Sequence, residues 1–277
     1  MADPPLAISN LAWTSADEAA ILPWLVRWGA QGVEVAPGRL GSWAELAPGR
    51  LRAYRDLLGA NGLVASSLQA VFYGREDVAL LHEEARFNAM CEHMKQVAEI
   101  AAALDARRIV FGAPRQRRRG AMEPAAAMAL AAERLASLGA IAADAGACLG
   151  IEPVPAVYGG DFLETAEDVI DLVRRIGHPG VRVHLDTACV TLGGGDIGRA
   201  ITAAGADLAH FHLAEPDLGD FATPRMPHAR AFAALAAAGY QGWTVVEMLG
   251  KGTDDAHRVR TALAAAIAAR NAAGALP

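Results

Sequence analysis

Short apolar segments alternate with longer helix-like segments along the whole chain, and this alternation limits the folds that the chain can form. Eight apolar segments have lengths and compositions typical of β-strands. The expected strands are Leu6–Asn10, Gly32–Ala36, Leu63–Gln69, Arg108–Gly112, Cys148–Pro153, Val181–Asp186, Leu208–Leu213 and Trp243–Met248. Strands separated by helices pair in parallel through right-handed crossovers. The pattern therefore predicts an α/β fold with a parallel sheet.

Helix-length segments fill the connections between most of these strands. The expected helices are Ala16–Trp28, Trp43–Ala60, Asp77–Leu104, Glu123–Ala145, Thr165–Ile176, His228–Ala238 and Asp254–Ala269. Gly62, Gly146, Gly177 and Gly239 stand where a helix should end before the next strand. These glycines support the expected boundaries.

An open doubly wound sheet and a closed barrel both fit this alternation. An open sheet that binds a dinucleotide has a glycine-rich turn after its first strand, whereas this chain has NLAW at residues 10–13. The glycine run at residues 193–195 lacks the GxGxxG spacing. The 277 residues, 53% of them hydrophobic, also suit one barrel, which typically uses about 250. We predict a single (β/α)₈ TIM barrel, with one domain over residues 1–277.

The net charge and the cysteine content limit which partners and which cellular compartment are expected. The net charge of −6 disfavours nucleic acid, which requires a basic face. Cys91, Cys148 and Cys189 are odd in number and form no CxxC pair, which predicts a reducing, cytoplasmic setting. The opening MADPPLAISNLAW has no basic region followed by an apolar core, and Arg270 interrupts the apolar stretch near the end. We therefore expect neither export nor a membrane partner.

Ionisable residues stand at the ends of four consecutive expected strands. Glu152, Asp186, His212 and Glu247 all fall in the inward phase of their strands. The carboxyl ends of barrel strands form the mouth where active sites lie. Three carboxylates in one place repel each other, and a divalent cation relieves that repulsion. Oxygen ligands with one imidazole favour Mn²⁺, Co²⁺ or Mg²⁺ over a thiolate zinc site, although Zn²⁺ is also compatible.

Three further inward residues lie near this expected metal site. His184 and His210 stand one inward step below Asp186 and His212, so we expect them to support the ligands rather than bind the metal. Glu34, near the end of the second strand, is either a substrate contact or a buried ion-pair partner.

Residues after the expected strands are candidates for binding a substrate. Arg115 opens an arginine-rich run at residues 115–119, and we expect it to reach a carboxylate or phosphate while most of the run is solvated. Gln69 and Tyr158 follow the third and fifth strands and are candidates for lining the pocket. His228 is either a substrate contact or an N-terminal residue of the next helix.

Four motifs in the second half of the chain together resemble a known superfamily. They are IEP at residues 151–153, HLDTA at 184–188, HFHLAEP at 210–216 and GYQGWTVVEM at 239–248. The chain resembles the xylose-isomerase-like barrels, and among them the sugar phosphate isomerases and epimerases that include ketose 3-epimerases. The resemblance implies one divalent metal on Glu152, Asp186, His212 and Glu247, with Glu152 and Glu247 as the proton-transfer pair.

The chain also departs from the ketose 3-epimerase pattern. Cys189, Tyr158 and Leu218 stand where those enzymes have a histidine, a substrate-binding glutamate and an arginine, and Arg225 is a candidate to replace that arginine from later in the loop. Endonuclease IV, another relative, has further histidines where this chain has Gln69 and Gly112. These differences leave the metal ligands intact but do not identify the sugar.

The expected function is a metal-dependent isomerase or epimerase that acts on a small carbohydrate, such as a sugar, a sugar phosphate or a related polyol. The proton moves at the carbon beside a metal-bound carbonyl, through an enediolate. A lyase or dehydratase with the same chemistry and a non-catalytic carbohydrate-binding barrel are the alternatives. Barrels of this family often form homodimers, and the sequence marks no interface.

Overall fold

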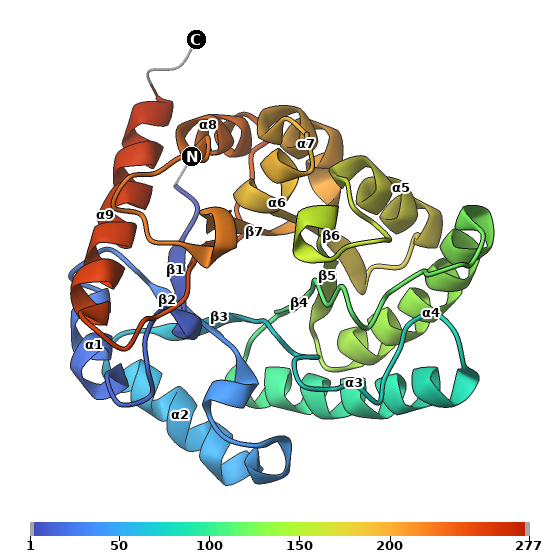
Figure 1. Cartoon of the computed structure of the whole chain (residues 1–277). Helices are drawn as coiled ribbons and strands as arrows, with labels where there is room; N and C mark the ends of the chain where they lie inside the picture. Colours follow the sequence, from blue (N-terminus) through green and yellow to red (C-terminus); the bar gives the residue numbers. More distant parts are fainter. Residues whose placement is uncertain (1–2, 275–277) are drawn as a thin grey trace.

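The computed structural model describes residues 3–274, in which eight parallel strands close into a barrel (Figure 1). The strands follow chain order, and the first pairs with the last, with Ala7 beside Val245. They are β1 (Leu6–Ser9), β2 (Gly32–Val35), β3 (Val64–Leu68), β4 (Arg108–Phe111), β5 (Cys148–Ile151), β6 (Val181–Asp186), β7 (Leu208–Ala214) and β8 (Thr244–Glu247). The predicted (β/α)₈ fold is confirmed, and every expected strand is present.

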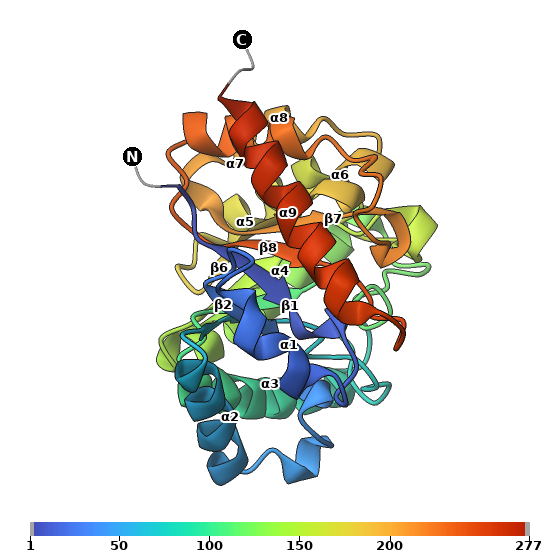
Figure 2. The same ribbon diagram turned by 90° about the vertical axis from the view of Figure 1, so that its left-hand side faces the viewer.

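Helices surround the barrel (Figure 1). They are α1 (Glu18–Leu25), α2 (Pro48–Ala60), α3 (Glu84–Leu104), α4 (Pro124–Asp144), α5 (Ala166–Ile176), α6 (Thr187–Leu192), α7 (Ile197–Ala204), α8 (His228–Ala237) and α9 (Asp255–Ala273). Figure 2 shows α9 crossing the outside of the barrel, where it contacts both α8 and α1. The apolar faces of these helices cover the outward side chains of the strands.

The connection between β6 and β7 contains two helices, α6 and α7, that the sequence pattern did not predict. Asp186 accepts a hydrogen bond from the Cys189 N–H and so caps α6. Asp196 caps α7 through the Arg199 N–H. Each helix is too short to show a clear helical period in the sequence, and the capping bonds decide where it begins.

Helix α4 combines a length and an apolar composition that would also suit a membrane span. In this barrel Ala131, Leu135 and Leu138 of α4 are fully buried, and the helix contacts α3, α5 and β5. One face of this apolar helix is therefore buried against the barrel.

Strand register brings the ends of β5 to β8 to one rim. Asp186 pairs with His212, and Ala214 pairs with Glu247 on the next strand. On the other side, Ile151 pairs with Phe111, so Glu152 follows directly at the same rim. Parallel pairing thus carries the four ionisable residues to the mouth of the barrel.

Two glycines allow α4 to approach the start of β6 closely. A methyl group on Gly139 would overlap Val181 and would lie 3.1 Å from the backbone of Gly180. We expect Gly139→Ala to lower the free energy of unfolding by about 1–3 kcal/mol through overpacking, against the helix preference of alanine.

The matched control is Gly59→Ala in α2, because nothing lies within 4 Å of a methyl group added there. This variant should gain about 0.5–1 kcal/mol in the free energy of unfolding. Urea denaturation measures both effects. Equal stability of the two variants would contradict the close packing of α4 on β6.

Candidate metal centre

Four ionisable side chains meet at the carboxyl ends of β5 to β8. Glu152 follows β5, Asp186 ends β6, His212 lies in β7 and Glu247 ends β8. One ligand atom from each of Glu152, Asp186 and His212 lies within 4.8 Å of the others. Glu247 joins the group, because its Oε2 lies 3.2 Å from His212 Nδ1. The structure thus brings together the four residues that the sequence singled out.

Burial and mutual repulsion destabilise the ionised forms of Glu152 and Asp186. Desolvation, followed by the charges of Glu247 and Asp186, raises the pKa of Glu152 to about 8. Desolvation, followed by Glu247, raises the pKa of Asp186 to about 6. A bound cation would remove this conflict, because it compensates several carboxylates at once.

The site also has ligand atoms without partners. One oxygen of Asp186 accepts the Cys189 N–H at 2.6 Å, whereas its Oδ2 is buried without a hydrogen bond. His212 Nδ1 is also buried, and the Glu247 carboxylate 3.2 Å away does not form a hydrogen bond with it. A side chain at Gly112 would overlap the Glu152 carboxylate, so this glycine leaves room for it. This oxygen-rich set with one imidazole nitrogen suits one divalent cation.

A buried carboxylate holds His212 from the side away from the mouth. Glu34 in β2 places Oε2 at 2.9 Å from His212 Nε2, while its Oε1 accepts from His210 Nε2 at 2.8 Å and from Ser67 Oγ at 2.7 Å. Although burial raises the pKa of Glu34, His212 and His210 hold that pKa well below its usual value. The sequence left two roles open for Glu34, and the structure identifies it as a buried partner of two histidines.

His184 and His210 lie beneath the four acidic and imidazole groups, where the sequence placed them. His184 Nε2 lies 3.4 Å from Glu152 Oε1, and its ring meets that of His212 edge-on at 4.2 Å. Burial, followed by His212 and His210, lowers the pKa of His184 well below its usual value. His184 is therefore neutral and packs under the site without adding charge.

Arg117 is a buried part of the site that the sequence did not reveal. The side chain is 1% exposed and donates to the backbone oxygens of Glu152 at 2.7 Å and Leu163 at 3.2 Å. Burial lowers the pKa of Arg117 to about 10, against the raising effect of Glu152. In an arginine-rich run, only the path of the loop distinguishes this buried arginine from its solvated neighbours.

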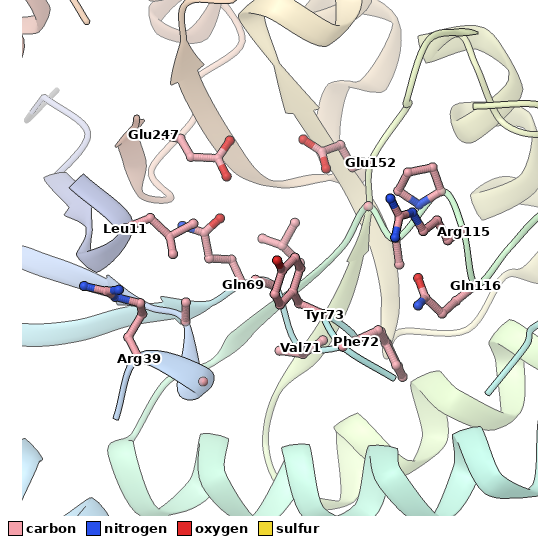
Figure 3. A pocket seen from close by; sticks show the side chains of 18 of the residues that line it. Leu11, Arg39, Gln69, Val71, Phe72, Tyr73, Arg115, Gln116, Glu152 and Glu247 are labelled. Carbon is pink, nitrogen blue, oxygen red and sulfur yellow. The ribbon is translucent and has the colours of Figure 1, made fainter. Parts of the chain in front are cut away.

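A cavity of about 940 Å³ opens at the barrel mouth (Figure 3). The carboxylates of Glu152 and Glu247 point toward each other across it. Of the predicted substrate contacts, Gln69 and Arg115 line this cavity. Gln69 is buried and donates to Ser9 Oγ, whereas Arg115 is exposed.

Tyr158, His228 and Arg225 do not line the cavity, so their positions do not support the predicted substrate contacts. Tyr158 Oη accepts the Asp217 N–H at 2.7 Å and joins two loops. Glu215 organises the other two: its Oε1 lies 2.8 Å from His228 Nε2, and its Oε2 accepts the Arg225 N–H at 2.9 Å. His228 begins α8, in line with the helical alternative for this residue.

A family comparison agrees with the barrel fold. The chain belongs to the xylose isomerase-like TIM barrel family, whose sequence model matches residues 22–269.

Parts of the chain are also similar to two proteins named D-psicose 3-epimerase. The chain is 35% identical over 86 residues to a D-psicose 3-epimerase of Ruminiclostridium cellulolyticum, covering 31% of this chain and 29% of that protein. It is 34% identical over 119 residues to a D-psicose 3-epimerase of Enterocloster bolteae, covering 43% of this chain and 39% of that protein. The matched segments thus span well under half of these relatives.

A solved structure of a D-psicose 3-epimerase in the presence of D-fructose has a similar fold. Its TM-score is 0.80 at 21% identity, and the match covers 98% of this chain and 99% of that one. At this identity the likeness concerns the fold.

The raised pKa values predict how the metal-free protein responds to pH. Glu152 and Asp186 have pKa values of about 8 and about 6, above their ordinary values of 4.5 and 3.8. Both acids therefore bind protons more tightly in the folded state than in the unfolded state. Their protonation stabilises the folded state fully below about pH 4, and this contribution is lost as the pH rises to 8.

With a chelator present, we expect the melting temperature to fall between about pH 5 and pH 8, and saturating Mn²⁺ to restore it at pH 8. Thermal melting at several pH values measures both effects. The chelated Glu152→Gln protein should show a smaller loss. A melting temperature that rises with pH in the chelated wild type would refute this assignment.

The contact between Glu34 and His212 predicts an effect on metal affinity. Glu34→Gln keeps the shape of the side chain but removes the charge that faces His212 Nε2. We expect Mn²⁺ affinity, measured by calorimetry, to fall by about 10–100-fold. Glu123→Gln, at an exposed position before α4, is the matched control and should bind Mn²⁺ like the wild type. Unchanged affinity in Glu34→Gln would show that Glu34 does not position the ligand.

Proposed function

We propose that this protein is a divalent-metal-dependent enzyme that isomerises or epimerises a carbohydrate by moving a proton at a carbon beside a carbonyl group. The observation that carries the proposal is the pair of carboxylates, Glu152 and Glu247, which face each other across the cavity (Figure 3). Bases on opposite sides of one carbon can remove a proton from one face and return one to the other. The segments shared with D-psicose 3-epimerases support this chemistry.

Glu152, Asp186, His212 and Glu247 are the proposed metal ligands, supported by their shared position and by the unpartnered atoms of Asp186 and His212. Mn²⁺, Co²⁺ and Mg²⁺ fit the donor set best, and Zn²⁺ is compatible. When bound, the cation would polarise the substrate carbonyl and so acidify the neighbouring C–H bond.

Two acidic residues carry out the proton transfers, and a buried arginine holds one of them in position. Glu152 removes or delivers the proton on the β5 side and Glu247 does so on the β8 side, so use of both faces gives epimerisation and use of one gives isomerisation. Arg117 anchors the backbone of Glu152 through its carbonyl oxygen, which limits the movement of the carboxylate. Gln69 lines the cavity below the two acids and is the proposed hydrogen-bonding contact to the sugar.

We further propose that residues 1–277 work as one domain in the cytoplasm. Three free cysteines, Cys91, Cys148 and Cys189, support a reducing setting. We propose a homodimer because barrels that resemble this one often form dimers. The substrate is a small carbohydrate, in line with the names of the relatives.

Proton transfer predicts exchange with solvent. We expect the Mn²⁺-loaded protein, incubated in D₂O with a panel of ketoses and sugar phosphates, to introduce deuterium at one carbon of its substrate. Glu152→Gln and Glu247→Gln should each lower this rate by about 10²–10⁴-fold, because each removes one proton-transferring group. NMR and mass spectrometry measure the exchange.

Glu123→Gln is again the control and should exchange deuterium at the wild-type rate, since Glu123 is exposed outside the cavity. A product that has lost water would identify a dehydratase instead. Full turnover by both glutamine variants would refute the proton-transfer assignment.

A further inference from the structure

Two arginines line the cavity in addition to the proposed catalytic acids. Arg39 ends the short 3₁₀ turn after β2, and Arg115 lies in the loop after β4. The two stand on opposite sides of the cavity (Figure 3). Arg134 pairs with the carboxylate of Glu84, whereas within residues 3–274 neither Arg39 nor Arg115 forms an ion pair, although both line a cavity.

The environment of Arg39 is incomplete without a further partner. Its Nη2 donates to the Trp13 backbone oxygen at 2.7 Å, and this bond fixes the guanidinium beside the cavity. Its Nε is buried and has no hydrogen-bond partner. A cation that is partly withdrawn from water without a counter-charge is destabilising, and a bound anion would offset that cost.

Among the residues that line the cavity, Arg39 and Arg115 are the ones that could bind a negatively charged group. Leu218 and Leu249 cover one part of the wall with apolar surface. Glu76 is the acid that lines the cavity besides Glu152 and Glu247, and it is exposed. The volume of about 940 Å³ lies near the top of the range for small-molecule pockets, about 300–1,000 Å³. The cavity therefore has room for a charged substituent beyond a sugar ring that contacts the two catalytic acids.

We propose that the substrate is a carbohydrate that bears a carboxylate or phosphate group, and that Arg39 binds this group. Arginine suits either anion, because its planar guanidinium forms two parallel hydrogen bonds with a pair of oxygens. Arg115 is more exposed and adds positive potential at the opposite wall. This inference rests on the proposed function, since it places the reacting part of the sugar at Glu152 and Glu247.

The test compares three probes that share a carbonyl and a hydroxylated chain: D-fructose, D-fructose 6-phosphate and 5-keto-D-gluconate. Calorimetry with the Mn²⁺-loaded protein measures the affinity for each. We expect at least one charged probe to bind about tenfold or more tightly than fructose, with the advantage shrinking as salt is added. The tighter of the two charged probes distinguishes a phosphate from a carboxylate.

Variants assign the charge preference to Arg39. Arg39→Gln should remove most of the preference and Arg39→Lys should retain part of it, because lysine keeps the charge without the planar donor pair. Arg115→Gln should reduce it less. Arg52→Gln, at an exposed position of α2 outside the cavity, is the matched control and should keep the full preference. Unchanged thermal melting and Mn²⁺ affinity show that each variant is folded.

The inference is overturned if no charged probe binds more tightly than fructose, or if the preference survives in Arg39→Gln. The deuterium experiment separates this failure from that of the proposed function. Deuterium exchange into neutral ketoses without any charge preference would refute the anion site and leave the proposed chemistry standing. An Arg39-dependent preference without deuterium exchange into any sugar would support the anion site and refute the proposed chemistry.

Discussion

Three carboxylates share the mouth of this barrel with one imidazole, and the surrounding structure is arranged around their repulsion. In the metal-free protein, burial and neighbouring charges raise the pKa of both Glu152 and Asp186, so bound protons relieve part of the repulsion up to a higher pH than is usual for these acids. A divalent cation would take over that role and would also satisfy the unpartnered atoms of Asp186 and His212. The same crowding that would be unfavourable in an ordinary core thus defines the candidate metal site.

The interior of the barrel supports this site with polar contacts where branched apolar side chains are usual. Glu34 reaches from β2 to two histidines of β7, His210 and His212, and also accepts a hydrogen bond from Ser67. These contacts run across the barrel. They form only when the barrel is closed, and they stabilise the closed barrel in turn. Because each of these groups is buried, loss of one partner leaves another polar atom unsatisfied, which costs about 1–3 kcal/mol. The interior therefore couples the stability of the barrel to the geometry of the mouth.

Much of the fold and part of the site were predictable from local patterns. Apolar runs located all eight strands, and alternation within β5 to β8 placed Glu152, Asp186, His212 and Glu247 on one rim. Local patterns failed where a contact between distant segments decides the structure. Arg117 was indistinguishable from the other arginines of its loop, and the capped helices α6 and α7 were too short to show a period. For His228 the deciding contact was with Glu215, thirteen residues earlier.

The sequence by itself determined the number and order of the strands and the inward phase of their last residues. Both follow from hydrophobicity and from the two-residue period of a strand, which are local properties. Only the tertiary structure decided which polar groups meet. Closure of the barrel brought Glu34 to His212, and the paths of the loops buried Arg117, placed Arg39 beside the cavity and kept Tyr158 and Arg225 away from it. Those outcomes depend on distances between segments far apart in the chain, and no local period encodes such distances.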